Sequence, residues 1–83
     1  MNKGMIAEEI EEFIKAHFSI GDDEDFTRDV NLFDYGFIDS LEATEIIVFL
    51  EERFSIEITQ KDIILYPMNT INEIAEVVQG KVG

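Results

Sequence analysis

Apolar residues recur at helical spacing in four segments, and they predict four helices, over residues 3–18, 40–54, 60–66 and 70–79. In the first segment, the residues that share one stripe are Ile6, Ile10, Phe13, Ile14 and His17. No segment shows the sustained polar–apolar alternation of a half-buried strand. The pattern therefore predicts an all-α protein. We expect a small four-helix bundle, with three main helices and one short helix, in a single domain over residues 1–83.

The segment over residues 40–54 carries apolar residues on two faces. At spacings of i, i+4, i+7 and i+11, its inward face is predicted to hold Ala43, Ile47, Leu50 and Phe54. The opposite face mixes apolar and acidic side chains, namely Leu41, Glu45, Val48 and Glu52, with Phe49 beside them. A face that meets only water is not expected to carry large apolar residues, so this one predicts a docking surface for other proteins. The alternative is that the preceding loop covers Phe49 and part of Val48.

The connection over residues 19–39 is long for a compact domain, and it begins with Gly21 and an acidic run at 22–25. The apolar residues predicted to anchor it to the core are Phe26, Val30, Leu32 and Phe33. A calcium-binding EF-hand loop needs Gly at its sixth position and Glu at its twelfth. Frames that start at Asp22 or Asp29 satisfy neither requirement. No metal site is therefore predicted, and loose cation binding by the acidic residues stays open.

Capping boxes mark the starts of the last two helices. Thr59 and Asp62 predict a short helix that ends before Pro67, because the residue before a proline disfavours the α region. Thr70 and Glu73 predict the start of the final helix. That helix is predicted to point inward Ile71, Ile74, Ala75 and Val78, and to have Gly80 as its C-cap.

Charge and composition narrow the range of functions. The 83 residues have a formal net charge of −13 and contain no cysteine, which excludes a disulfide framework and a cysteine-based zinc site. So acidic a surface disfavours nucleic acid and anionic membranes and favours proteins with basic patches, although solubility alone is an alternative explanation. No apolar run is long enough to span a bilayer, and no secretory signal pattern is seen. We expect a cytoplasmic monomer without membrane insertion.

The stretch over residues 34–42 joins the long loop to the second predicted helix. Gly36 allows a positive φ angle, and therefore a sharp turn before the helix. Ser40 is predicted to be the N-cap, whose hydroxyl accepts a backbone N–H of the first turn. A second interpretation is that Ser40 presents its hydroxyl at the positive end of the helix dipole, where a phosphate is favoured.

This stretch and the residues behind it resemble the acyl carrier protein family. The resemblance rests on Leu32-Phe33-Asp34-Tyr35-Gly36, Asp39-Ser40-Leu41, Ile46, Leu50-Glu51 and Phe54-Ser55-Ile56, and it covers nearly the whole chain. It implies that a phosphopantetheinyl transferase moves a phosphopantetheine arm from coenzyme A to the Ser40 hydroxyl. The arm's thiol would then hold a cargo acid as a thioester and present it to loading and condensing enzymes.

The resemblance also implies roles for the neighbours of Ser40. Asp39 helps to orient the site for the transferase and its metal, and partner enzymes would meet Leu41, Glu45, Val48 and Glu52. The protein is expected to be a carrier and not an enzyme, because no residue is placed by the sequence to activate Ser40. His17, the only histidine, is predicted to lie at the edge of the core.

The spacing between Gly36 and Asp39 departs from that of the common fatty-acid carriers, which have one residue where Phe37 and Ile38 stand here. The longer spacing is similar to that of D-alanyl carriers and of stand-alone carriers in specialised pathways. The cargo therefore stays open between fatty acyl, polyketide and aminoacyl groups. An alternative from another class is an unmodified acidic helical bundle that acts as an interaction module, with Ser40 as a plain N-cap.

Overall fold

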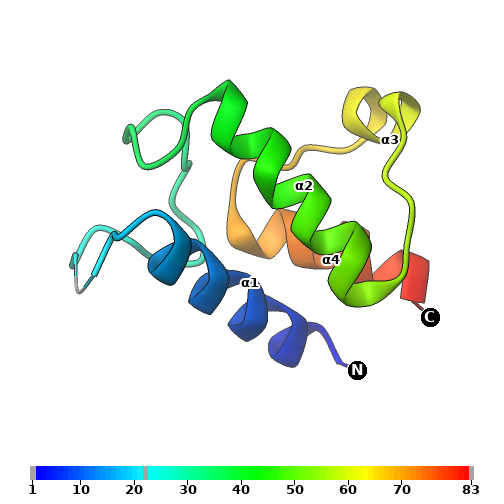
Figure 1. The fold of residues 1–83 in the computed structure, drawn as a ribbon, viewed down its shortest axis with the longest axis horizontal. Coiled ribbons are helices and arrows are strands. Elements are labelled where there is room, and N and C mark those ends of the chain that lie inside the picture. Colours follow the sequence, from blue (N-terminus) through cyan, green and yellow to red (C-terminus); the bar gives the residue numbers. More distant parts are fainter. Residues whose placement is uncertain (1, 22, 83) are drawn as a thin grey trace.

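The computed structural model describes residues 2–21 and 23–82, and these fold into four helices without a strand. In chain order the helices are α1 (Lys3–His17), α2 (Ser40–Phe54), α3 (Gln60–Leu65) and α4 (Ile71–Val82) (Figure 1). The prediction of an all-α bundle with one short helix is confirmed. Asp22, the first residue of the acidic run, lies outside the described residues. Within the described part of the chain, no helix has the length and apolar character needed to cross a membrane.

The core lies where α1, α2 and α4 meet, and α1 packs chiefly against α4. The largest side chains with no exposed surface come from the three long helices and the loop: Ile6, Ile10, Ile14, Leu32, Leu50, Ile71 and Val78. On α2 the buried line is Ile46, Leu50 and Phe54, whereas Ala43 and Ile47 are only partly buried. The inward face of α2 thus includes Ile46, which the spacing argument left out.

The ends of α3 and α4 test the predicted caps. The Thr59 hydroxyl accepts a hydrogen bond from the Asp62 N–H, and an Asp62 carboxylate oxygen accepts one from the Thr59 N–H, so this capping box is confirmed. The box between Thr70 and Glu73 is confirmed in the same way, with distances of 3.0 and 3.1 Å. The prediction of Gly80 as a C-cap is wrong, because α4 continues through it to Val82.

The long loop is held against the bundle by side chains and by its backbone. Phe26, Val30 and Leu32 are buried as predicted, but Phe33 is 38% exposed and does not serve as a core anchor. Ile38, which was not among the predicted anchors, is buried instead. The Leu32 N–H donates to the Asn69 carbonyl at 2.9 Å, and the Asn72 N–H donates to the Arg28 carbonyl at 3.0 Å. These bonds tie the loop to the start of α4.

Candidate functional site

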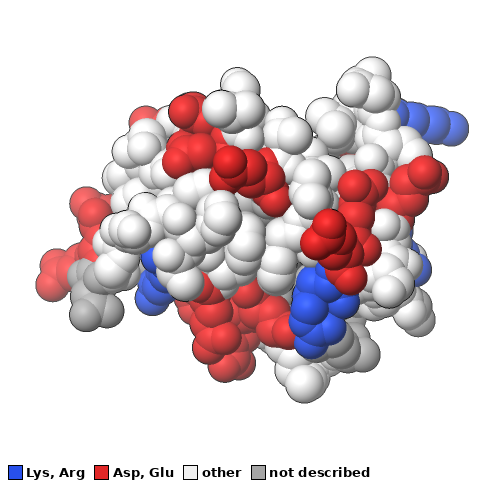
Figure 2. Space-filling model, in the orientation of Figure 1, with Lys and Arg blue, Asp and Glu red and all other residues white. Residues whose placement is uncertain are grey.

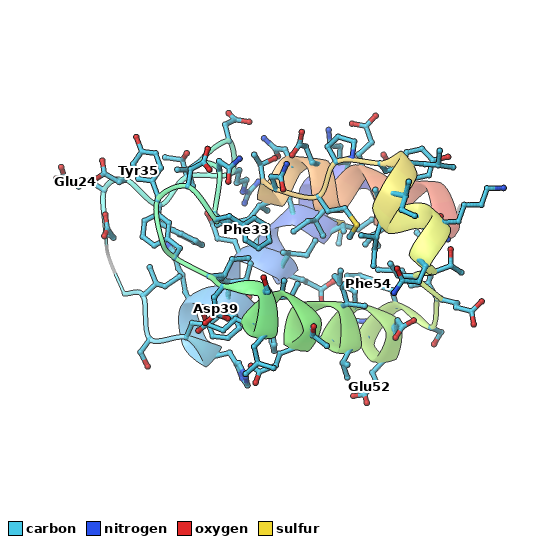
Figure 3. The ribbon with its side chains drawn as sticks, turned by 90° about the horizontal axis from the view of Figure 1, so that it is seen from above. Glu24, Phe33, Tyr35, Asp39, Glu52 and Phe54 are labelled. Carbon is cyan, nitrogen blue, oxygen red and sulfur yellow. The ribbon has the colours of Figure 1, made fainter. Side chains whose placement is uncertain are left out.

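Ser40 is the first residue of α2, and its side chain is exposed. The prediction that it caps the helix is wrong, because Asp39 takes that role (Figure 3). Asp39 has extended backbone angles, and its Oδ1 accepts from the Glu42 N–H at 2.8 Å while Glu42 Oε1 accepts from the Asp39 N–H at 2.9 Å. Among residues 2–21 and 23–82, the Ser40 hydroxyl has no hydrogen-bond partner. The hydroxyl is therefore exposed and not engaged in capping the helix.

The turn before Ser40 explains how the chain delivers this serine to the surface. Gly36 has φ +75°, a conformation in which a side chain is strained. The N–H groups of Phe37 and Ile38 both donate to the Leu32 carbonyl, at 3.0 and 3.2 Å, which closes the turn. Phe37 packs edge-on against Phe26, and Ile38 is buried in the core. The two residues between Gly36 and the helix thus both anchor the turn.

The electrostatics of this helix end suit an anion. The first N–H groups of a helix have no partner within it, and they carry the positive end of its dipole. The capping box supplies side-chain acceptors for the N–H groups of Asp39 and Glu42. In the described part of the chain, the N–H groups of Ser40 and Leu41 have no acceptor, so they are available to an anion.

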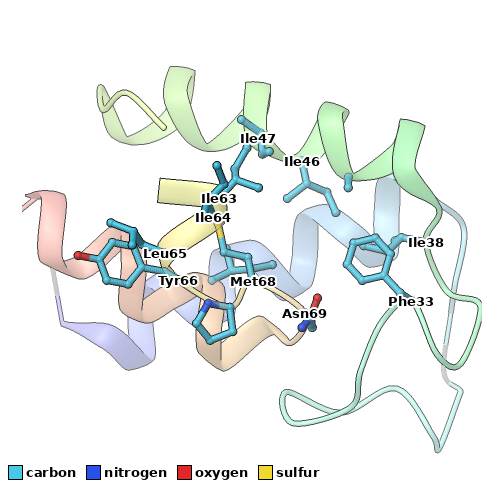
Figure 4. Close-up of a pocket in the computed structure, with 13 residues that line it drawn as sticks. Phe33, Ile38, Ile46, Ile47, Ile63, Ile64, Leu65, Tyr66, Met68 and Asn69 are labelled. Atoms are coloured by element: carbon cyan, nitrogen blue, oxygen red, sulfur yellow. The ribbon is translucent and has the colours of Figure 1, made fainter. Parts of the chain in front are cut away.

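A cavity of about 450 Å³ lies between α2, α3 and the segment that leads into α4 (Figure 4). Its lining is largely apolar and consists of Phe33, Ile38, Ala43, Ile46, Ile47, Ile63, Ile64, Leu65, Tyr66, Pro67, Met68, Asn69 and Ile74. Ile38 stands two residues before Ser40, so the cavity begins close to the serine in the chain. Sequence reasoning did not predict this cavity. The signal available in the sequence was the apolar run Ile63-Ile64-Leu65. In the structure, α3 buries none of its residues, and this run lines the cavity instead.

The predicted docking residues lie on one surface. Leu41 and Val48 are 73% and 47% exposed, and both acids are exposed as well, with Glu52 pointing away from the bundle (Figure 3). These four residues help to line a shallow depression between α1 and α2, which we call the α1–α2 depression; the others are Phe13, His17, Thr44 and Phe49. No residue of the long loop lines this depression beside Phe49. Instead, the ring of Phe13 from α1 stacks on it, with the ring centroids 4.0 Å apart.

His17 lies at the edge of this depression, and its side chain is 48% exposed. Its Nε2 is 3.0 Å from Glu45 Oε2, which places a side chain of α1 on an acid of the predicted docking face. No residue of the described chain hydrogen-bonds the Ser40 hydroxyl, so His17 does not act on that group directly.

A helical bundle that presents an unbonded serine at the start of a helix has the form of a carrier domain. The sequence matches the family described as "Phosphopantetheine attachment site" over residues 6–78, and the chain belongs to that family. No match was found among curated proteins. A domain of this family is the site of covalent phosphopantetheine attachment, and its members are carriers and not catalysts. The resemblance to acyl carrier proteins is therefore confirmed at the level of the family.

Proposed function

We propose that the protein is an acyl carrier protein and that Ser40 is its attachment residue. The observation that carries this proposal is the exposed Ser40 hydroxyl, freed from capping by Asp39 and placed beside two free N–H groups. In the attachment step, Ser40 Oγ forms a bond to the phosphorus that joins pantetheine to the nucleotide in coenzyme A. The phosphoanhydride bond breaks, and the nucleotide leaves with the electron pair.

The proton of the Ser40 hydroxyl passes to a base of the transferase, because the described chain offers no hydrogen-bonded base of its own. Asp39 caps the helix through Oδ1, and its Oδ2 has no partner among the described residues. That oxygen is available to a metal ion held by the transferase. When bound, the arm supplies a thiol that holds the cargo as a thioester.

The cavity beside α3 favours an acyl cargo. Removal of a hydrocarbon chain from water stabilises the bound form by about 0.8 kcal/mol for each buried CH₂ group. A cavity lined mainly by aliphatic and aromatic side chains supplies such a site. The ammonium group of an aminoacyl cargo would lose its hydration there without an ion partner. The spacing between Gly36 and Asp39 is similar to that of D-alanyl carriers as well as of stand-alone carriers in specialised pathways, so the aminoacyl alternative stays open and the second test below separates it.

The first test is the mass of the intact protein after incubation with coenzyme A and a broad-specificity transferase. We expect the wild type to gain one phosphopantetheinyl group and Ser40→Ala to gain none. If several transferases leave the wild type unchanged, the proposal is wrong and the unmodified interaction module is favoured.

The second test compares protein loaded with octanoyl, acetyl and alanyl groups. An octanoyl chain that enters the cavity raises the melting temperature above that of the acetyl form, and the alanyl form resembles the acetyl form. Equal melting temperatures for all three would remove the argument for an acyl cargo. A rise with alanyl alone would favour an aminoacyl carrier.

We also propose that partner enzymes dock on Leu41, Glu45, Val48 and Glu52. Glu45→Lys should slow association with a basic partner, and this effect should fade as salt rises. Val48→Asp should instead speed dissociation, and its effect should persist at high salt. Glu24→Lys, in the loop far from α2, makes the same charge reversal as a control (Figure 3). Normal loading and normal downstream use of both face variants would exclude this surface.

A further inference from the structure

The α1–α2 depression has a continuous aromatic wall that crosses from one helix to the other. Phe13 stacks on Phe49 of α2 on one side and lies parallel to the ring of His17, 4.9 Å away, on the other. The exposed Leu41 and Val48 flank this wall. Figure 2 shows an uncharged area over α1 and α2 that is bordered mostly by acidic side chains, with Lys and Arg at its lower edge. A depression that is apolar inside and acidic at its rim fits a cationic side chain next to an apolar one.

His17 occupies part of the acidic rim. Its Nε2 contacts Glu45 Oε2 at 3.0 Å, and both side chains are about half exposed. Glu52, one turn beyond Val48, forms no ion pair with the described residues. An arginine binds a carboxylate most strongly through two parallel hydrogen bonds, which require both carboxylate oxygens. His17 already bonds to Oε2, so it competes with such an arginine for this carboxylate.

We propose that the docking surface extends onto α1, and that an arginine of the phosphopantetheinyl transferase binds Glu45 by displacing His17. The neighbouring apolar side chain of the transferase packs against Phe13 and Val48. This inference rests on the proposed function, since it concerns the enzyme that loads Ser40. It adds a residue of α1 that competes with the partner for the docking acid.

Two substitutions at position 17 should act in opposite directions. His17→Ala removes the competitor and should raise kcat/KM for loading by about two- to fivefold, the range typical of an exposed ion pair. His17→Lys places a permanent cation beside Glu45 and should lower kcat/KM by a similar factor. Both effects should shrink at high salt, because the competing groups are exposed.

The controls separate competition from changes in charge or folding. Lys3→Ala removes an α1 cation that pairs with Glu76 of α4 at 3.3 Å, so it frees an acid on another face. Glu24→Gln raises the net charge by one, as His17→Lys does when His17 is neutral. Both controls should load at the wild-type rate, and melting curves should show all variants folded.

A binding experiment gives a readout that does not depend on turnover. Ser40→Ala protein cannot be loaded, so its titration with the transferase should shift the NMR signals of the His17 and Phe13 rings. Position-17 variants that both load like the wild type, or that change in the same direction, would overturn the inference, as would unshifted ring signals. If the wild type itself is never loaded, the proposed function fails and the inference fails with it. If the wild type is loaded and neither position-17 variant changes the rate of loading, the inference is refuted and the proposed function stands.

Discussion

The exchange of roles between Asp39 and Ser40 makes a sharp prediction about stability. Asp39→Ala removes the 2.8 Å hydrogen bond to the Glu42 N–H, and loss of a cap of this type costs about 1 kcal/mol, within a range of ~0.5–2 kcal/mol. It also removes a negative charge from the positive end of α2, which adds ~0.3–1 kcal/mol. The free energy of unfolding should therefore fall by about 1–2 kcal/mol. Ser40→Ala removes a hydroxyl that bonds to nothing in the described chain, and its effect should stay within ~0.5 kcal/mol.

Urea unfolding followed by circular dichroism at pH 7 measures both values. Asp39→Asn is a matched control, because asparagine caps a helix about as well as aspartate but lacks its charge. The free energy of unfolding of Asp39→Asn should therefore fall only by the electrostatic part, ~0.3–1 kcal/mol. If Ser40→Ala costs about 1 kcal/mol and Asp39→Ala almost nothing, then Ser40 is the cap and the account of its free hydroxyl is wrong.

Two further predictions concern the core and the attachment of α3. Leu50→Ala should lower the free energy of unfolding by ~2–5 kcal/mol, because Leu50 has no exposed surface. Leu41→Ala should change it by no more than ~0.5 kcal/mol, because Leu41 is exposed. Equal losses for the two variants in urea unfolding would contradict the assignment of faces. The Lys81 ammonium, with help from Thr59, lowers the pKa of Asp62 from 3.8 to about 2. Because the folded pKa is the lower one, this stabilisation is complete above about pH 4 and is lost as the pH falls towards 2. The difference in unfolding free energy between the wild type and Asp62→Asn should shrink over that range, and a constant difference would refute it.

Much of the fold follows from local signals. The apolar spacing within each helix and the reciprocal pairs Thr59–Asp62 and Thr70–Glu73 depend on residues close in sequence, and these predictions hold. The start of α2 was harder, because Asp39 and Ser40 are both good caps and differ by one residue in register. Glu42 is the deciding signal, since it stands three residues after Asp39 and completes a capping box only with that residue.

Other features depend on contacts between distant parts of the chain. Phe49 is covered by Phe13, which lies 36 positions earlier, and no local pattern could show which element would cover it. Gly80 lies within α4 although glycine is a poor helix former. The next residue, Lys81, pairs with Asp62 of α3 at 2.9 Å, a tertiary contact that favours helix beyond the glycine. The cavity beside α3 likewise exists only once three separate segments have come together.

The most direct test of the central claim is the location of the modification after loading with coenzyme A. The chain has three serines, and both Ser19 and Ser55 have positive φ angles at the ends of helices, whereas Ser40 begins one. Proteolysis and tandem mass spectrometry should place one phosphopantetheinyl group on the peptide that contains Ser40, with Ser19 and Ser55 unmodified. A group on either of those serines, or a chain that no transferase modifies, would contradict the account.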